Sequence, residues 1–318
     1  MFSFHSFIFP THYGVLGFWG PQNPKTPTDQ AIARGYNIQN MITRSSGKVS
    51  KLKSKEQRGE DTFGNQYQSI DQMWKSELKP EEAKMMEAAG IIPEGGIKGR
   101  VGDEKQWYKK QIEYWDSQEA SINGVLGGYG HVHHTDIDTS SGFLNHFKDR
   151  IGTGRALDCG AGMGRVTKHL LLPRFAKVDM VEPSKVQIDK GRIYVESENV
   201  ENFYMVGLQE FEFQHKYDVV WVQWVLCYLT DADLLVFLKK CRANLVDQKK
   251  SMLFVKENVH DTSFYVDKDD NSVVRCDKMF EELFEQGGFT VVKHIYQPGF
   301  PKDLYRISLF ALVVTNPE

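Results

Sequence analysis

LDCGAGMGR, residues 157–165, is the stretch of this chain that indicates its fold. A short apolar run precedes it, and a helical pattern follows over 166–172. Glycines remove side chains where a backbone must turn sharply and approach a ligand, and a helix that begins near Gly164 offers unpaired N–H groups to an anion. A second apolar run, 177–181, ends at Glu182, an acid placed to hold both hydroxyls of an adenosine ribose. Strand, glycine turn, helix, strand and acid together predict a nucleoside-cofactor half-site.

The spacing of the glycines distinguishes between nucleoside cofactors. They alternate at 160, 162 and 164, with Asp158 two residues before the first, whereas the dinucleotide fingerprint is G-x-G-x-x-G. This form suits S-adenosylmethionine, which has no pyrophosphate but carries a carboxylate. The planar fork of Arg165 can hold that carboxylate; the less favoured alternative is a solvated residue at the start of the helix. The pattern therefore favours S-adenosylmethionine as the cofactor.

The remaining periodicity predicts alternating strands and helices. Strands are expected over 156–159, 178–181, 203–206, 219–221 and 252–255, and helices over 105–115, 166–172, 186–196, 231–244 and 277–286. Two final strands, 290–296 and 307–314, are expected to form an antiparallel pair at the sheet edge. The predicted fold is α/β: a seven-stranded, mostly parallel Rossmann-like sheet with helices on both faces and an antiparallel C-terminal edge strand.

Five residues follow the carboxyl ends of the predicted strands, where ligands bind in such sheets. They are Gly160, Glu182, Gln209, Gln223 and Asn258. Gln209 suits either a hydrogen bond to an adenine or an exposed turn. Trp224 suits either a wall for a flat substrate group or a place in the core, and the sequence alone favours the core.

Three acids, Asp267, Asp269 and Asp270, cluster before a helical segment. They fit helix caps and solvated loop charge, or an acidic pocket for a cationic substrate. Methyl transfer to an amine requires a neutral nitrogen. An α-amine, with a pKa of about 7.7–8.0, loses its proton more readily than a lysine side chain at about 10.4. A terminal amine is therefore the easier substrate for a site with one carboxylate base.

Composition sets the protein class. The 318 residues are 41% hydrophobic and 25% charged, with a formal net charge of −3 that argues neither for nor against nucleic acid. The four cysteines are scattered without a C-x-x-C pair, so neither disulfides nor structural zinc is expected, and a reducing compartment is favoured. No metal site is predicted elsewhere in the chain. No apolar run reaches the roughly 18 residues of a membrane span, and the first 20 residues lack the basic region of a secretory signal.

The chain is expected to divide into an extension, 1–100, and a methyltransferase domain, 101–318. Residues 30–55 contain no acid but six basic residues. We interpret this stretch as a solvated, disordered basic arm, with a transit peptide or a nucleic-acid-binding arm as alternatives.

With these pieces in place, the chain resembles the protein α-N-terminal methyltransferases that act on Xaa-Pro-Lys N-termini. The matching strings lie in the family's order over about residues 103–314. They are YKKQIEYW (108–115), GVLGGYGH (124–131), ALDCGAGMGRVTKHLLLP (156–173), VDMVE (178–182), GLQEF (207–211), YDVVWVQWV (217–225) and DKDDNSVVR (267–275).

The resemblance implies roles for individual residues. S-adenosylmethionine would be held by Gly160, Arg165, Glu182, Leu208, Gln209 and Gln223, and covered by Trp115 and the loop around Gly130. The peptide would be bound by residues from several segments. Trp224 would pack on the second-position proline, which reverses the preference for the core. Asn258 would position the amine, Tyr114 would touch the peptide backbone, Asp267 and Asp270 would receive the third-position lysine, and Tyr305 would line the channel.

Two positions depart from the family's pattern. Glu182 stands where an aspartate is common, which lengthens the reach but keeps the chemistry. Tyr228 stands where a histidine is common, and a phenol with a pKa of about 10 is a poor base at neutral pH. We therefore assign the base role to Asp270, leave Tyr228 to orient the amine or a water, and expect Asp270→Asn to slow methylation more than Tyr228→Phe.

The resemblance implies transfer of one to three methyl groups to the α-amine of protein or peptide N-termini, with the enzyme in cytoplasm and nucleus. Two alternatives stay open. One is methylation of another cationic amine, and the other is a non-catalytic binding module. Deleting residues 1–100 is expected to spare most of an enzyme's turnover but to abolish a binder's main interaction.

Overall fold

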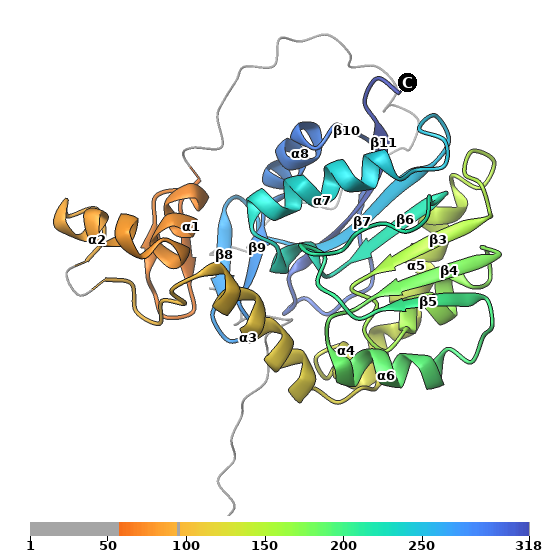
Figure 1. Ribbon diagram of the computed structural model, residues 1–318, viewed down its shortest axis with the longest axis horizontal. Coiled ribbons are helices and arrows are strands. Elements are labelled where there is room, and N and C mark those ends of the chain that lie inside the picture. The colour runs from red at the N-terminus through yellow and green to blue at the C-terminus, as the bar shows by residue number, and fades with distance from the viewer. Residues whose placement is uncertain (1–56, 94–95, 318) are drawn as a thin grey trace, which may run out of the picture.

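The computed structural model describes residues 57–93 and 96–317. Its main sheet has seven strands in the order β10-β11-β7-β6-β3-β4-β5 (Figure 1). The strands are β3 (Arg155–Cys159), β4 (Lys177–Val181), β5 (Val200–Tyr204), β6 (Val219–Gln223), β7 (Met252–Val259), β10 (Phe289–Tyr296) and β11 (Arg306–Val314). The predicted seven-stranded, mostly parallel sheet is confirmed.

The antiparallel pair at the edge is arranged differently in one detail. β11 is antiparallel to both β10 and β7. The C-terminal strand therefore lies one position inside the sheet, and β10 is the edge strand. β5 also begins three residues earlier than the expected 203–206, because its side chains are only partly buried and give a weak hydrophobic signal.

Alternation along the strands divides the interior into two cores, one on each face of the sheet. Leu157, Val220 and Leu253 belong to the face covered by α7 (Asp231–Ala243) and α8 (Asp277–Gln286). Ala156, Trp221 and Phe254 belong to the opposite face, covered by α5 (His133–Asn145) and the π-helical turn η3 (Thr167–Leu171). The remaining helices near the strand ends are α3 (Glu104–Ser117), α4 (Ile122–Val125) and α6 (Lys185–Tyr194), with the 3₁₀ turns η2 (Gly130–Val132) and η4 (Leu226–Tyr228).

A second, four-stranded sheet has the order β2-β1-β8-β9. It joins β1 (Gly59–Asp61) and β2 (Gln66–Tyr67) to the hairpin of β8 (Phe264–Asp267) and β9 (Ser272–Arg275). β1 runs parallel to β8, and Gly59 pairs with Phe264. A Cβ at Gly59 would lie 2.4 Å from the Phe264 ring, so only glycine allows this approach. This sheet was not predicted from the sequence, because its strands have two to four residues and no alternation of apolar and polar residues.

Residues before 100 also form α1 (Ile70–Leu78) and α2 (Pro80–Ala88). In Figure 1, α1 lies beside β8, and α2 lies farther out on the same side. Tyr67, Ile70 and Met73 are buried in the same core as α7 and α8. The division at residue 100 stays a prediction, and the basic arm over 30–55 lies outside the described residues. Across 57–93 and 96–317, no helix has the length and apolarity to cross a membrane.

Candidate functional site

The glycine turn forms the floor of a pocket at the carboxyl ends of β3, β4 and β6. Gly160 has a φ of +67° and Gly164 a φ of +85°, conformations that disfavour other residues. A Cβ at Gly160 would lie 2.6 Å from Cβ of Val225, and one at Gly164 would lie 2.5 Å from Val195. The glycines therefore serve both the turn and the close packing around it.

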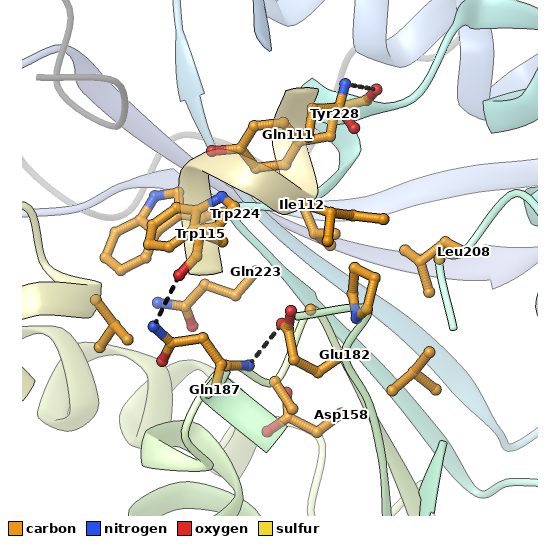
Figure 2. Close-up of a pocket in the computed structure, with 18 of the residues that line it drawn as sticks. Gln111, Ile112, Trp115, Asp158, Glu182, Gln187, Leu208, Gln223, Trp224 and Tyr228 are labelled. Carbon is orange, nitrogen blue, oxygen red and sulfur yellow. Dashed lines mark hydrogen bonds between the residues drawn. The ribbon is translucent and has the colours of Figure 1, made fainter. Parts of the chain in front are cut away.

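Glu182 follows β4 and faces the pocket (Figure 2). Its carboxylate accepts hydrogen bonds from the backbone N–H of Gly162 at 3.0 Å and of Ser184 at 2.8 Å. Burial raises its pKa to about 7, against the lowering effect of these N–H groups. The carboxylate is thus fixed by the backbone and can accept hydroxyl hydrogens from a ribose.

Arg165 belongs to a buried charge cluster that the sequence analysis did not foresee. Its Nη1 donates to Asp136 on α5 at 2.7 Å. The same carboxylate accepts from Gln223 Nε2 at 3.1 Å and from the ammonium of Lys256 on β7. All four side chains are buried. We call these four residues the Asp136 cluster.

The Asp136 cluster carries a net positive charge, because one carboxylate faces two cations. Burial acts to raise the pKa of Asp136, but the attraction of Lys256 and Arg165 outweighs it and lowers that pKa to about 2. Burial lowers the pKa of Lys256, opposed by Asp136. The sequence offered one signal for the cluster, a lysine at the end of an apolar run. Arg165 and Gln223 reach the pocket, so the excess charge favours an anionic group there.

Trp224 is both a core residue and a wall of the pocket, the two roles considered for it from the sequence. It is only 6% exposed and packs in the core, yet it lines the pocket. Its φ is +54°, rare for a residue with a side chain, and its backbone N–H donates to the Lys256 carbonyl at 2.9 Å. The Cζ of Arg165 and the Nζ of Lys256 lie 5.7 and 5.9 Å from its ring. Its expected contact with a proline stays a prediction.

Helix α3 covers the pocket from above. Tyr108, Gln111, Ile112 and Trp115 line it on this side. The carbonyl of Trp115 accepts from Nε2 of Gln187 on α6 at 3.3 Å, which ties α3 to α6 (Figure 2). Gln187 and the α3 residues other than Trp115 are lining residues that sequence reasoning missed.

The structure brings seven of the eight expected cofactor residues to this one pocket, namely Trp115, Gly160, Arg165, Glu182, Leu208, Gln209 and Gln223. The eighth, Gly130, is not among the lining residues. It begins η2, where its N–H donates to Oδ1 of Asn123 at 3.1 Å.

Tyr228 connects the pocket to the acids of the β8–β9 turn. It lines the pocket, and its hydroxyl donates to Oδ2 of Asp270 at 2.8 Å. Burial, followed by the charge of Asp267, raises the pKa of Asp270 well above its usual range. Burial also raises the pKa of Asp267 to about 7. These acids are therefore buried side chains of a hairpin rather than caps and solvated loop charge, although Asp269 is exposed.

The other expected substrate residues lie on the elements around this acid pair. Asn258 is buried near the end of β7, opposite Ile307 of β11. Tyr305 lies just before β11, and burial followed by Tyr265 and Asp267 raises its pKa. Tyr114 is half-buried on α3, its ring 5.4 Å from that of Trp115. None of the three lines the pocket itself, and their roles stay predictions.

The pocket fits S-adenosylmethionine. The Glu182 carboxylate suits ribose hydroxyls, the positive Asp136 cluster suits a carboxylate, and Leu208 with Gln209 offers an apolar contact and a side-chain amide to an adenine. The glycine turn lets the backbone approach the ligand without side chains in between.

Comparison with known proteins points to the same chemistry. A family model described as AdoMet dependent proline di-methyltransferase matches residues 103–313. The chain is 39% identical to alpha N-terminal protein methyltransferase 1 of Dictyostelium discoideum over 80% of this chain and 90% of that protein. It is also 39% identical to N-terminal Xaa-Pro-Lys N-methyltransferase 1 of Danio rerio over 67% of this chain and 97% of that one.

A solved structure extends the similarity to the fold. The SAM-dependent methyltransferase of Leishmania major is 36% identical and superposes with a TM-score of 0.71. The match covers 84% of this chain and all of that one.

Proposed function

Since the chain belongs to the family of AdoMet-dependent proline di-methyltransferases, we propose that it methylates the α-amino group of proteins that begin Xaa-Pro-Lys. The chain is an S-adenosylmethionine-dependent methyltransferase by that membership. The narrower substrate is supported by the names of its relatives and by one feature of the site. Tyr228 joins the cofactor pocket to two buried carboxyl groups, which suit a lysine side chain close to the reacting amine.

The chain's own residues divide into a cofactor half and a peptide half. Glu182 would hold the ribose, Arg165 within the Asp136 cluster the carboxylate, and Leu208 with Gln209 the adenine. When bound, S-adenosylmethionine supplies the methyl group on its sulfonium. Trp224 and Trp115 exclude water from the space where that group would be presented, since both line the pocket.

The peptide half must hold a cation and receive a proton. A lysine ammonium next to Asp267 and Asp270 favours their ionised forms, which reverses the effect of burial on their pKa values. Ionised Asp270 can then accept the proton of a terminal amine. The hydroxyl of Tyr228 orients that carboxylate through the 2.8 Å hydrogen bond.

A mass spectrum tests the proposal. A peptide that begins Ser-Pro-Lys and its N-acetylated twin are incubated with the enzyme and S-adenosylmethionine. Mass steps of one methylene on the free peptide alone support the proposal and count the methyl groups added. Shifts on both peptides would identify a side-chain amine as the target instead. No shift on either, with the cofactor bound, would favour another amine or a binding role.

We also propose, from the resemblance alone, that the protein acts in cytoplasm and nucleus. Fluorescence microscopy of the tagged full chain would test this placement.

A further inference from the structure

The turn between β8 and β9 is held from two sides. It spans residues 268–271, follows Asp267 and contains Asp270. On one side α3 contacts its backbone: Nε2 of Gln111 donates to the Asn271 carbonyl at 2.9 Å, and the ammonium of Lys110 donates to the Lys268 carbonyl. On the other side lie residues 59–78, which precede the region matched by the family model. We call residues 59–78 the N-terminal clamp.

A buried ionic cluster joins the clamp to the turn. The Nζ of Lys268 lies 2.5 Å from Oε1 of Glu77 and 3.9 Å from Oδ2 of Asp61. The hydroxyl of Tyr67 lies between these carboxylates, 2.7 Å from Glu77 and 2.8 Å from Asp61. Lys268, Glu77 and Asp61 are all buried. Buried charges persist only with partners, so the turn's lysine and the clamp's acids hold each other in place.

The clamp also contacts the turn's backbone and one of its acids directly. The Oγ1 of Thr62 accepts from the Lys268 N–H at 3.0 Å and lies 3.5 Å from Oδ1 of Asp267. The Thr62 N–H donates to the Val266 carbonyl at 3.1 Å, and Asp61 pairs with Val266 in the β1–β8 register. The position of the Asp267 carboxylate is therefore set in part by a residue 205 positions away in the chain.

We propose that the N-terminal clamp is a positioning part of the peptide site, which sets selectivity for a cation at the third position by holding Asp267 and Asp270. This inference rests on the proposed function. It changes the expectation for the extension: deleting residues 1–100 removes the clamp and impairs peptide selection, rather than sparing most of the turnover.

The test is a conservative substitution in the full chain. Thr62→Val keeps the shape of the side chain but removes the three polar contacts of its hydroxyl, to the Lys268 N–H, the Asp267 carboxylate and the Val266 carbonyl. We expect the KM for a Ser-Pro-Lys peptide to rise about five- to tenfold, as for the loss of one or two hydrogen bonds, with kcat and the affinity for S-adenosylmethionine unchanged. The KM for a Ser-Pro-Met peptide should not change. Thr290→Val is the matched control, since Thr290 is exposed on the edge strand β10 and bonds only to Thr315 in the described structure.

A double variant tests the ionic cluster. Glu77→Gln with Lys268→Met removes the two paired charges together, while Asp61 keeps its hydrogen bonds from Phe63, Asn65 and Tyr67. We expect a larger loss of lysine selectivity, with folding checked by circular dichroism and cofactor binding retained.

The outcomes separate the two proposals. If wild type methylates the Ser-Pro-Lys peptide but both variants keep its selectivity, the clamp has no positioning role. If wild type does not methylate the peptide at all, the proposed function fails, and the clamp's role fails with it.

Discussion

Lys256→Met is the substitution that most directly probes the Asp136 cluster. The Nζ of Lys256 contacts the Asp136 carboxylate, and it donates to Ser140 Oγ at 2.9 Å and to Gln297 Oε1 at 2.7 Å. The side chain is fully buried. Methionine fills a similar volume but leaves these acceptors without their donor. It also removes one of the two cations that give the cluster its positive charge.

The magnitude follows from burial and charge. Removal of one partner of a buried ion pair costs about 3–5 kcal/mol. In a domain of this size each kcal/mol lowers Tm by about 2–4 °C, so Tm should fall by roughly 6–20 °C. Lys256 lies 5.9 Å from the Trp224 ring at the pocket wall. A unit charge acting over about 10 Å at an effective dielectric of about 20 contributes about 1.7 kcal/mol, so the cofactor should bind roughly ten- to twentyfold more weakly.

The assay has two readouts, the Tm from differential scanning fluorimetry and the cofactor Kd from calorimetry. Lys84→Met is the control, because Lys84 pairs with Glu81 on α2 and both side chains are exposed. The control should change neither quantity appreciably. A Lys256→Met protein with wild-type cofactor affinity would show that the cluster's net charge does not act on the pocket. One with unchanged Tm would refute the burial argument.

Three further predictions concern the pocket and its acids. Under saturating cofactor, Asp270→Asn should lower kcat more than Tyr228→Phe, because the phenylalanine variant loses only the 2.8 Å hydrogen bond that orients the base; the opposite order would assign proton removal to Tyr228. The pKa of Glu182 is raised to about 7, and ribose binding needs its ionised carboxylate. Cofactor affinity should therefore strengthen as the pH rises from about 6 to 8. Titration calorimetry of Glu182→Gln should show no such dependence of affinity on pH. In the ligand-free protein, Glu182 keeps its proton up to about pH 7, whereas in the unfolded chain its pKa is 4.5. The stability that this difference contributes is fully present below pH 4.5 and is lost as the pH rises through about 7. Gly160→Ala should reduce the free energy of unfolding by the cost of a left-handed residue, about 1–2 kcal/mol, and so lower Tm. It should also weaken cofactor binding, because the added Cβ meets Val225. An alanine variant with full cofactor affinity would mean that the turn adapts.

Most of the main sheet was predictable because its signals are local. Each unit of strand, turn and helix carries its own hydrophobic period, and the glycine turn with Glu182 lies within a single such unit. The carboxyl-end rule then placed Gln209 and Gln223 at the pocket that they line, but it also placed Asn258 there, which is not among the lining residues. β8 and β9 were not predictable, because four-residue strands buried on both faces show no alternation.

The sequence by itself determined the α/β class, the cofactor half-site and, through the resemblance, the family. Only the tertiary structure decided which residues support that site, namely the Asp136 cluster and the N-terminal clamp. Asp136 and Lys256 are 120 residues apart, and Thr62 and Lys268 are 206 apart. No local pattern in the sequence links such residues, since each one, taken alone, is an ordinary polar residue with no sign of its partner. They become partners only because the sheet order and the second sheet bring them together in an interior where a buried charge must find its counterpart.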